Sequence, residues 1–134
     1  MLNKLWEVLF KRKPEEIAVS VEKDGFGLWI KLAANNQLRA RMDCVIESDT
    51  TILIGDIRHY KENSHYNRGY GSLMMEELLG YAKENGFSYI HGNLAQVDLD
   101  HKERLHHFYR KFGFIISAYP EPQDSYYGKI ELNL

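Results

Sequence analysis

Hydrophobic and polar positions alternate along the first half of the chain, and this alternation predicts β-strands. Every second residue from Leu38 to Ile46 is apolar, while two arginines and an aspartate lie between them, which is typical of a half-buried strand. Two β-rich runs, 17–22 and 26–32, flank Asp24-Gly25, a dipeptide that favours a hairpin turn. The run 51–58 stays apolar on both faces until Asp56, which predicts a central strand covered on both sides.

The pattern changes after residue 70, where apolar positions recur at helical spacing. A helix is predicted over 71–84, and Asn85-Gly86 ends it before a short strand at 87–93. A strand, a helix and a strand at this spacing form a right-handed parallel crossover. A second helix is predicted from an Asp98 or Asp100 cap to Lys111, followed by paired strands at 114–118 and 126–132.

The fold class is therefore a mixed α+β or α/β sheet. It begins with an antiparallel meander of about four strands and continues with a parallel strand-helix-strand crossover, a second helix and a C-terminal strand pair. We expect residues 1–13 to form an N-terminal amphipathic helix and residues 14–134 to form a single domain. The helix packs on its own domain, or it binds a partner or a membrane surface.

Composition and charge narrow the classes of function. With 17 Lys and Arg against 19 Asp and Glu, the net charge of -2 argues against a general nucleic-acid binder. The single cysteine, Cys44, is interpreted as a buried thiol rather than a reactive one, and a reducing, cytoplasmic setting fits. No apolar run is long enough for a membrane span. Three of the six histidines fall on different sides of the helix ending at Lys111, so no metal site is expected.

One stretch indicates ligand chemistry, namely Tyr66-Asn67-Arg68-Gly69-Tyr70-Gly71-Ser72-Leu73-Met74. It follows the apolar run at 52–57 and begins the helix at 71–84. A strand, a glycine-bearing loop and a helix form an arrangement that holds phosphate. The glycines allow close backbone approach, and the free N–H groups of the first helical turn point at an anion.

Two motifs, at the separation that the family uses, resemble the GNAT superfamily of acyl-CoA-dependent N-acetyltransferases. The first is the Gln/Arg-x-x-Gly-x-Gly/Ala loop, which reads Tyr66-Asn67-Arg68-Gly69-Tyr70-Gly71 in this chain, with Tyr66 in place of Gln or Arg. The second is the helix end Phe-Tyr-x-Lys-x-Gly-Phe, matched by Phe108, Tyr109, Lys111, Gly113 and Phe114. The resemblance covers residues 50–118 well and the rest in outline.

The resemblance implies acetyl-CoA as co-substrate. The backbone amides of the loop would hold its pyrophosphate, through Tyr66, Asn67, Arg68, Gly69, Tyr70, Gly71 and Ser72. The Arg68 side chain either adds charge near the phosphates or is solvated. The strands at 51–58 and 87–93 would splay apart, and backbone groups of Ile57, Arg58 and His59 would line the pantetheine arm. Asn93 hydrogen bonds this arm, or it is a turn residue at the end of its strand.

For catalysis, the resemblance places Tyr109 near the sulfur of coenzyme A, where it would donate a proton to the departing thiolate. Packing in the core is the alternative for this aromatic residue. Asp56 is the best-placed base, on the face shared by Ile52 and Ile54, and Glu62 is the second candidate. Asp56 could equally be a strand-end residue that the backbone satisfies.

The leading functional hypothesis is an N-acetyltransferase that acts on a primary amine of a small molecule or peptide. Two alternatives are a catalytically silent acyl-CoA-binding module and a protein-interaction module with the same fold. The family's usual pair of helices beside the acceptor has no room between Glu15 and Phe26. The N-terminal helix and the hairpin at Asp24-Gly25, or the second subunit of a homodimer, would then shape the acceptor side.

Overall fold

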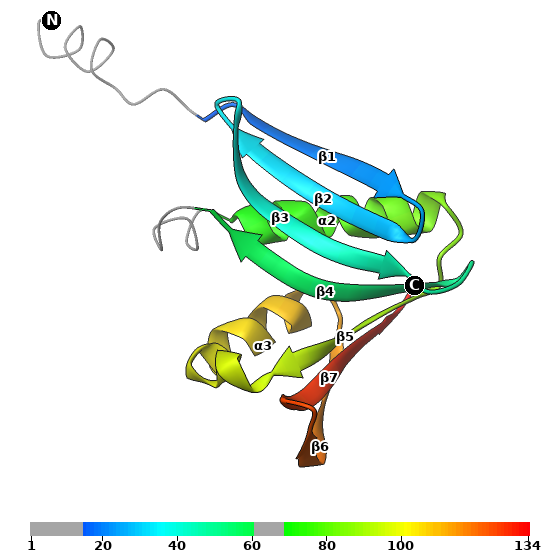
Figure 1. The fold of residues 1–134 in the computed structure, drawn as a ribbon, viewed down its shortest axis with the longest axis vertical. Helices are drawn as coiled ribbons and strands as arrows, with labels where there is room; N and C mark the ends of the chain where they lie inside the picture. Colours follow the sequence, from blue (N-terminus) through cyan, green and yellow to red (C-terminus); the bar gives the residue numbers. More distant parts are fainter. Residues whose placement is uncertain (1–14, 61–68) are drawn as a thin grey trace, which may run out of the picture.

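A single mixed sheet is the frame of the molecule, which a computed structural model describes over residues 15–60 and 69–134 (Figure 1). The sheet has seven strands in the order β1-β2-β3-β4-β5-β7-β6. Their bounds are Ile17–Asp24 (β1), Gly27–Ala34 (β2), Gln37–Ile46 (β3), Thr51–His59 (β4), Tyr89–Ala95 (β5), Ile115–Gln123 (β6) and Tyr126–Asn133 (β7). The predicted meander, crossover and C-terminal strand pair are confirmed. The predicted helix at 1–13 and the residues Glu62, Tyr66, Asn67 and Arg68 lie outside the described ranges.

The turns follow local chemistry in the first half of the chain and depart from prediction in the second. The predicted hairpin is present, but its two turn residues are Gly25, with φ of 59°, and Phe26, because Asp24 still pairs with Gly27. Asn35 and Asn36 form the next turn with φ of 52° and 64°. The first strand of the C-terminal pair is predicted to end at residue 118, but β6 continues to Gln123 through two prolines. Proline is tolerated there because β6 is the edge strand of the sheet and needs no second hydrogen-bonded neighbour.

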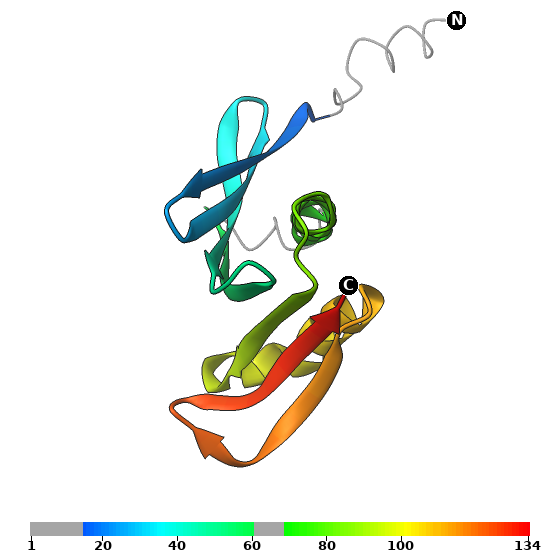
Figure 2. The same ribbon diagram turned by 90° about the vertical axis from the view of Figure 1, so that its right-hand side faces the viewer.

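Two helices pack on the sheet, α2 (Tyr70–Glu84) and α3 (Lys102–Lys111). Figure 2 shows α2 lying along one side of the β1–β4 part of the sheet. A six-residue 3-10 helix, η2 (Gln96–His101), precedes α3, so the predicted Asp98 or Asp100 cap is wrong and His101 is the N-cap residue. Neither α2 nor α3 has the length and apolarity that crossing a membrane requires.

The core lies on one face of the sheet, between the strands and the two helices. Cys44 is 3% exposed, as predicted, and burial, with a contribution from Asp43, raises the pKa of its thiol to about 12. The fully buried large side chains, all in this core, are Leu28, Ile30, Leu32, Met42, Ile52, Tyr70, Met74, Met75, Leu78, Ile90, Leu94 and Ile130.

The opposite face of the sheet carries no buried side chain in the described part of the chain. The expectation that β4 is covered on both sides is therefore wrong for these residues. Leu53 is half-buried, and its neighbour Val45 on β3 is 43% exposed. A strand with two apolar faces is covered on both sides only when elements pack on both faces of its sheet. The chain has no helix between β1 and β2 that could cover the second face.

Candidate active site

The sheet opens between two parallel strands at its centre. β4 pairs with β5 only from Thr51 opposite Tyr89 to Ile54 opposite Gly92, although both strands continue beyond that point. Figure 1 shows the ends of β4 and β5 diverging, with the start of α2 near the end of β4. Backbone N–H and C=O groups of β4 after Ile54 are therefore not used by β5, and an extended ligand with amide groups can pair with them. The predicted splay of these two strands is present.

A β-bulge lies at the point where β4 leaves β5. Cys44 of β3 pairs with Ile54 and Asp43 pairs with Asp56, so Gly55 is the extra residue. An extra residue shifts the alternation of side chains by one position. The sequence predicted that Asp56 shares the buried face of Ile52 and Ile54. Because of the bulge, Asp56 instead lies on the open face, the side of the sheet opposite the core, with its side chain 63% exposed. The prediction that this carboxylate is partly buried is therefore wrong.

Asp56 belongs to a row of alternating charges on the open face. The Arg58 Nε atom lies 3.3 Å from an oxygen of Asp56 and 3.3 Å from an oxygen of Asp43. The Arg41 Nε atom lies 2.6 Å from the other oxygen of Asp43. The row places two carboxylates and two guanidinium groups beside the opening between β4 and β5. Asp56 and Arg58 are its more exposed end.

The start of α2 has the features of an anion site. Gly69 is the N-cap residue with φ of 76°, a left-handed conformation that favours glycine. The first turn contains no acidic residue and no described side chain caps it, so its N–H groups remain for a ligand. A Cβ atom at Gly71 would lie 3.2 Å from the Phe108 ring, so glycine also lets α3 pack against this turn. The Tyr70 side chain is buried, and its hydroxyl donates a hydrogen bond of 2.8 Å to Glu15. Any contact of Tyr70 with a ligand is therefore through its backbone.

A lysine of the second motif, which the sequence analysis did not predict as a site residue, also lies at the start of α2. Lys111, at the end of α3, donates a hydrogen bond of 2.5 Å from Nζ to the Ser72 hydroxyl. A cation beside the positive end of a helix dipole is unfavourable unless an anion shares the site. The signal in the sequence was the lysine of the helix-end motif, but its contact with Ser72 depends on how α3 packs against α2.

Tyr109 projects from α3 into the core and is 7% exposed. Its ring packs edge-on against Phe108 and Phe114, with centroids 5.2 Å and 5.4 Å away. Burial raises the pKa of its hydroxyl well above the ordinary value, and the nearby Asp98 carboxylate adds to this effect. A smaller influence of Asp56 acts in the same direction. A phenol in this setting stays protonated at neutral pH and is available as a hydrogen-bond donor.

The other predicted residues take different positions around the opening. Ile57 and His59 follow the bulge and pair with Met42 and Ala40 of the buried face, and both are half-buried. Asn93, on β5, is exposed, and its side-chain oxygen accepts a hydrogen bond of 3.0 Å from the Tyr119 hydroxyl. This bond fixes the amide oxygen of Asn93.

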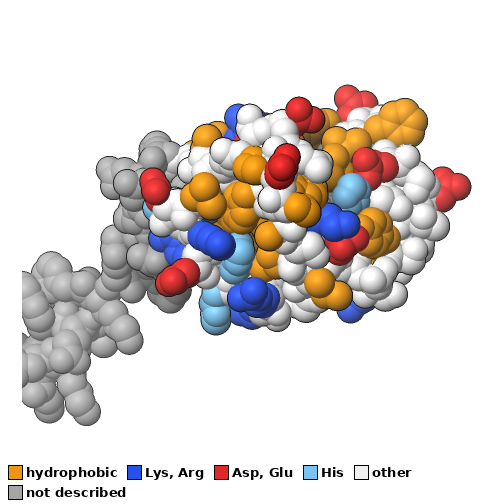
Figure 3. Space-filling model, turned by 90° about the horizontal axis from the view of Figure 1, so that it is seen from below, with side chains coloured by type: hydrophobic (Ala, Val, Ile, Leu, Met, Phe, Trp, Pro, Cys, Tyr) orange, Lys and Arg blue, Asp and Glu red, His pale blue; other side chains and the backbone are white. Residues whose placement is uncertain are grey.

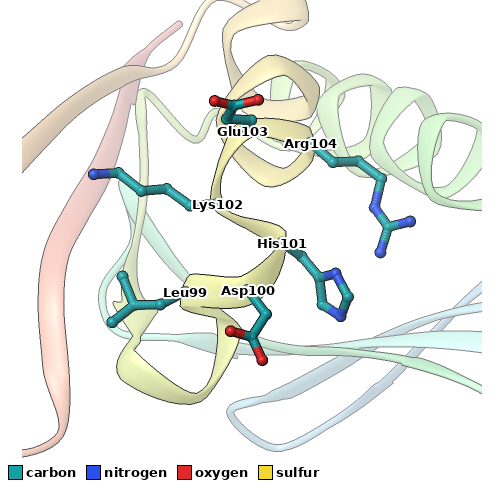
Figure 4. Close-up of a pocket in the computed structure, with 6 residues that line it drawn as sticks. All are labelled: Leu99, Asp100, His101, Lys102, Glu103 and Arg104. Atoms are coloured by element: carbon teal, nitrogen blue, oxygen red, sulfur yellow. The ribbon is translucent and has the colours of Figure 1, made fainter.

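A surface hollow at the junction of η2 and α3 is a separate feature. Six consecutive residues, Leu99 to Arg104, line it. In Figure 4 the side chains of Leu99 and Lys102 point to one side, whereas those of His101 and Arg104 point to the other. Side chains that diverge in this way do not converge on a ligand, so we do not assign the hollow to the active site.

A sheet that opens beside a glycine-capped helix is the fold shared with solved GNAT acetyltransferases. The chain is a member of the GNAT acetyltransferase family, whose model, described as "Acetyltransferase (GNAT) family", matches residues 6–114. The resemblance seen in the two sequence motifs is thereby confirmed.

One curated relative is similar in sequence, and solved acetyltransferase structures share the fold. The protein is 36% identical over 66 residues to the uncharacterized protein YocC of Bacillus subtilis, a match covering 49% of this chain and only 37% of that relative. A GNAT family acetyltransferase from Elizabethkingia anophelis, solved with acetyl-CoA bound, superposes with a TM-score of 0.67 at 15% identity, covering 88% of this chain and 98% of the other. The ribosomal-protein-S18-alanine N-acetyltransferase of Escherichia coli superposes with a TM-score of 0.63 at 14% identity, over 83% and 71% of the two chains. At these identities the structural matches establish the fold.

Proposed function

We propose that the protein transfers an acetyl group from acetyl-CoA to a primary amine of a small molecule or peptide. The observation that carries this proposal is the end of β4–β5 pairing at Ile54 and Gly92, next to the uncapped start of α2. The first offers backbone groups to an amide-bearing arm, and the second offers N–H groups to a pyrophosphate. Acetyl-CoA has both groups. The acetyl-CoA bound to the Elizabethkingia neighbour supports the same choice of donor.

The residues present fit this donor. Backbone groups from Gly69 to Ser72, with the amides of Tyr66, Asn67 and Arg68, would hold the pyrophosphate, and the Lys111 ammonium would supply the matching charge. Backbone groups of β4 from Ile57 to His59 would line the pantetheine arm. The nitrogen of the Asn93 amide is the group left to bind this arm, because its oxygen accepts from Tyr119.

The chemistry is attack of an amine nitrogen on the thioester carbonyl carbon, followed by cleavage of the carbon–sulfur bond. A backbone N–H near the Gly55 bulge would polarise the carbonyl oxygen. Asp56, directly or through water, would take a proton from the attacking ammonium, and it must first leave its ion pair with Arg58. Tyr109 would give its proton to the departing thiolate. Holding both reactants in one pose supplies the rest of the rate.

The acceptor side is the open face of the sheet around Asp56 and Arg58, which no described helix covers. An open face admits a peptide as easily as a small amine. The Escherichia coli neighbour acts, by its name, on an alanine of a ribosomal protein, which supports including peptides among the acceptors. In a homodimer, the second subunit would cover part of this face and restrict which acceptors can bind.

Release of free coenzyme A tests the proposal. We expect the full chain to release thiol from acetyl-CoA in the presence of at least one member of a panel of peptides with free N-termini, polyamines and amino sugars. Mass spectrometry should show a gain of one acetyl group on that acceptor. Binding of acetyl-CoA without thiol release from any acceptor would favour the silent binding module, which the pairing of Asp56 with Arg58 already makes a specific alternative.

A further inference from the structure

The charged side chains that β3 and β4 place on the open face are sorted by sign along the strands. Asp43 of β3 lies opposite Asp56 of β4, and at the next open-face position Arg41 lies opposite Arg58. Lys31 of β2 extends this basic line, because it pairs with Arg41. A line of carboxylates and a line of cations therefore run side by side across the strands. Figures 1 and 2 show α2 behind these strands, so both lines lie on the side that faces the viewer in Figure 1.

Arg58 is the cation of this group that is best placed to bind a further anion. Its side chain is 54% exposed, against 29% for Arg41. Arg41 donates a hydrogen bond of 3.3 Å to Asp43. In the described part of the chain, the Arg58 side chain instead has its two ion pairs, with Asp43 and Asp56. A guanidinium has five N–H donors in a fork that matches a carboxylate, so Arg58 can keep Asp43 and bind an anion as well.

An acceptor that carries an anion gains more from this arrangement than one that does not. In the proposed reaction the ammonium group of the acceptor binds Asp56 and displaces Arg58 from it. An acceptor without an anion exchanges one ion pair for another. An acceptor with a carboxylate a few bonds from its amine forms two, because the displaced guanidinium binds that carboxylate. The Arg58 Nε atom lies 3.3 Å from the Asp56 oxygen, so one end of a ligand can reach both groups.

An apolar area borders the carboxylates on the side away from the cations. Val45 is 43% exposed, and it pairs with Gly27 of β2 and with Leu53 of β4, which is half-buried. The Trp29 ring lies over Gly27, where a Cβ atom would clash with it. A single amino acid bound at the charged groups leaves this area uncovered, whereas the next residues of a peptide can lie on it and bury apolar surface.

The sorted charges of the open face contrast with the underside of the molecule. Seen from below, acidic and basic side chains are scattered among apolar ones (Figure 3). With 17 Lys and Arg against 19 Asp and Glu, the chain as a whole does not attract anions. Selection of an acidic acceptor therefore depends on contacts at the open face rather than on the overall charge.

From these observations we infer that the acceptor is a peptide whose first residue is aspartate or glutamate, and that Arg58 selects it. The inference rests on the proposed function and adds the class of acceptor. The α-ammonium group binds Asp56, which takes a proton from it. The side-chain carboxylate of the same residue binds Arg58, and the following residues lie on the apolar area formed by Trp29, Val45 and Leu53. Attack of the amine on the thioester carbon gives the N-acetyl peptide and coenzyme A, with one proton released to water.

The test measures thiol release with three pentapeptides that differ only in their first residue, which is glutamate, glutamine or lysine. We expect the kcat/KM of wild type to be roughly fivefold higher for the glutamate peptide than for the glutamine peptide, mainly through KM, because one partly exposed guanidinium–carboxylate contact distinguishes them. Arg58→Gln should bring this ratio to about one, and Arg58→Glu should favour the lysine peptide. Arg58→Lys should keep part of the preference, because it keeps the charge.

Lys31→Gln is the matched control, because Lys31 belongs to the same basic line but lies two strands from Arg58 and pairs with Glu22. This variant should keep the wild-type preference. The ratio between two peptides does not depend on the fraction of folded protein in a sample, so it separates recognition from stability. Added salt should lower the ratio in wild type, because salt screens exposed charges.

Four outcomes contradict the inference. Equal kcat/KM for the glutamate and glutamine peptides in wild type removes it and leaves the acetyltransferase function intact. A preference that survives in Arg58→Gln shows that another residue selects the acceptor. Faster transfer to free glutamate than to the glutamate peptide overturns the choice of a peptide. The absence of thiol release with these peptides, polyamines and amino sugars alike removes the proposed function, and the inference with it.

Discussion

Replacing Tyr109 with phenylalanine is expected to lower kcat by roughly ten- to a thousandfold while leaving the affinity for acetyl-CoA unchanged. The substitution removes one hydroxyl and keeps the ring that packs against Phe108 and Phe114. In the proposed mechanism this hydroxyl gives its proton to the departing thiolate, and its raised pKa keeps it protonated until then. Steady-state kinetics of thiol release, with calorimetric binding of acetyl-CoA, measure both quantities.

The control for this prediction is Tyr81→Phe, on the far part of α2, where the ring stacks on Phe87. We expect both variants to melt within a few degrees of wild type and only Tyr109→Phe to lose rate. A coenzyme A thiol is acidic enough that it does not always need a proton in the rate-limiting step. An unchanged kcat in Tyr109→Phe would remove this residue from the mechanism and leave it a role in core packing.

Replacing Lys111 with alanine is expected to raise the Kd of acetyl-CoA roughly ten- to a hundredfold with little change in kcat, since one hydrogen bond to a charged group contributes about 1.5–3 kcal/mol. Lys111 donates to Ser72 in the first turn of α2, where the helix dipole alone repels a cation. The proposed pyrophosphate at this turn would balance the charge of the lysine. Calorimetry at two salt concentrations should show a weaker salt dependence in the variant.

Lys83→Ala is the matched control, because Lys83 is an exposed lysine in the last turn of α2, at the opposite end of this helix from Ser72. The Lys111 ammonium also lies 5.1 Å from the centre of the Phe112 ring, so a structural role must be tested separately. Equal melting temperatures for the two variants, with weaker binding only in Lys111→Ala, support the phosphate contact. Equal affinities in both variants would show that Lys111 does not contact the donor.

Local patterns in the sequence predicted the elements but not their register. Alternation over 38–46 and the Asp24-Gly25 turn appear in the structure as β3 and the β1–β2 hairpin, because side-chain period and turn chemistry act locally. The bulge at Gly55 depends on pairing with β3, and it moved Asp56 to the open face. A second bulge, at Tyr127 of β7, depends on pairing with β5 in the same way.

The residues of the candidate site show the same difference between local patterns and contacts that depend on packing. The glycines at positions 69 and 71 and the Phe108-Tyr109 pair could be recognised from the two motifs that resemble the family, because the proposed chemistry depends on backbone freedom and on one phenol. The contact of Lys111 with Ser72 joins the end of one helix to the start of another. No local pattern encodes such a contact, because it depends on how the two helices pack against each other.

Binding of acetyl-CoA to the full chain, measured by isothermal titration calorimetry, tests the central claim most directly. The opening between β4 and β5 and the uncapped start of α2 predict that one molecule of acetyl-CoA binds per chain. Free coenzyme A should compete with this binding, and Lys111→Ala should weaken it. The absence of binding heat up to about 1 mM acetyl-CoA, where the binding free energy is only about 4 kcal/mol, would contradict the claim.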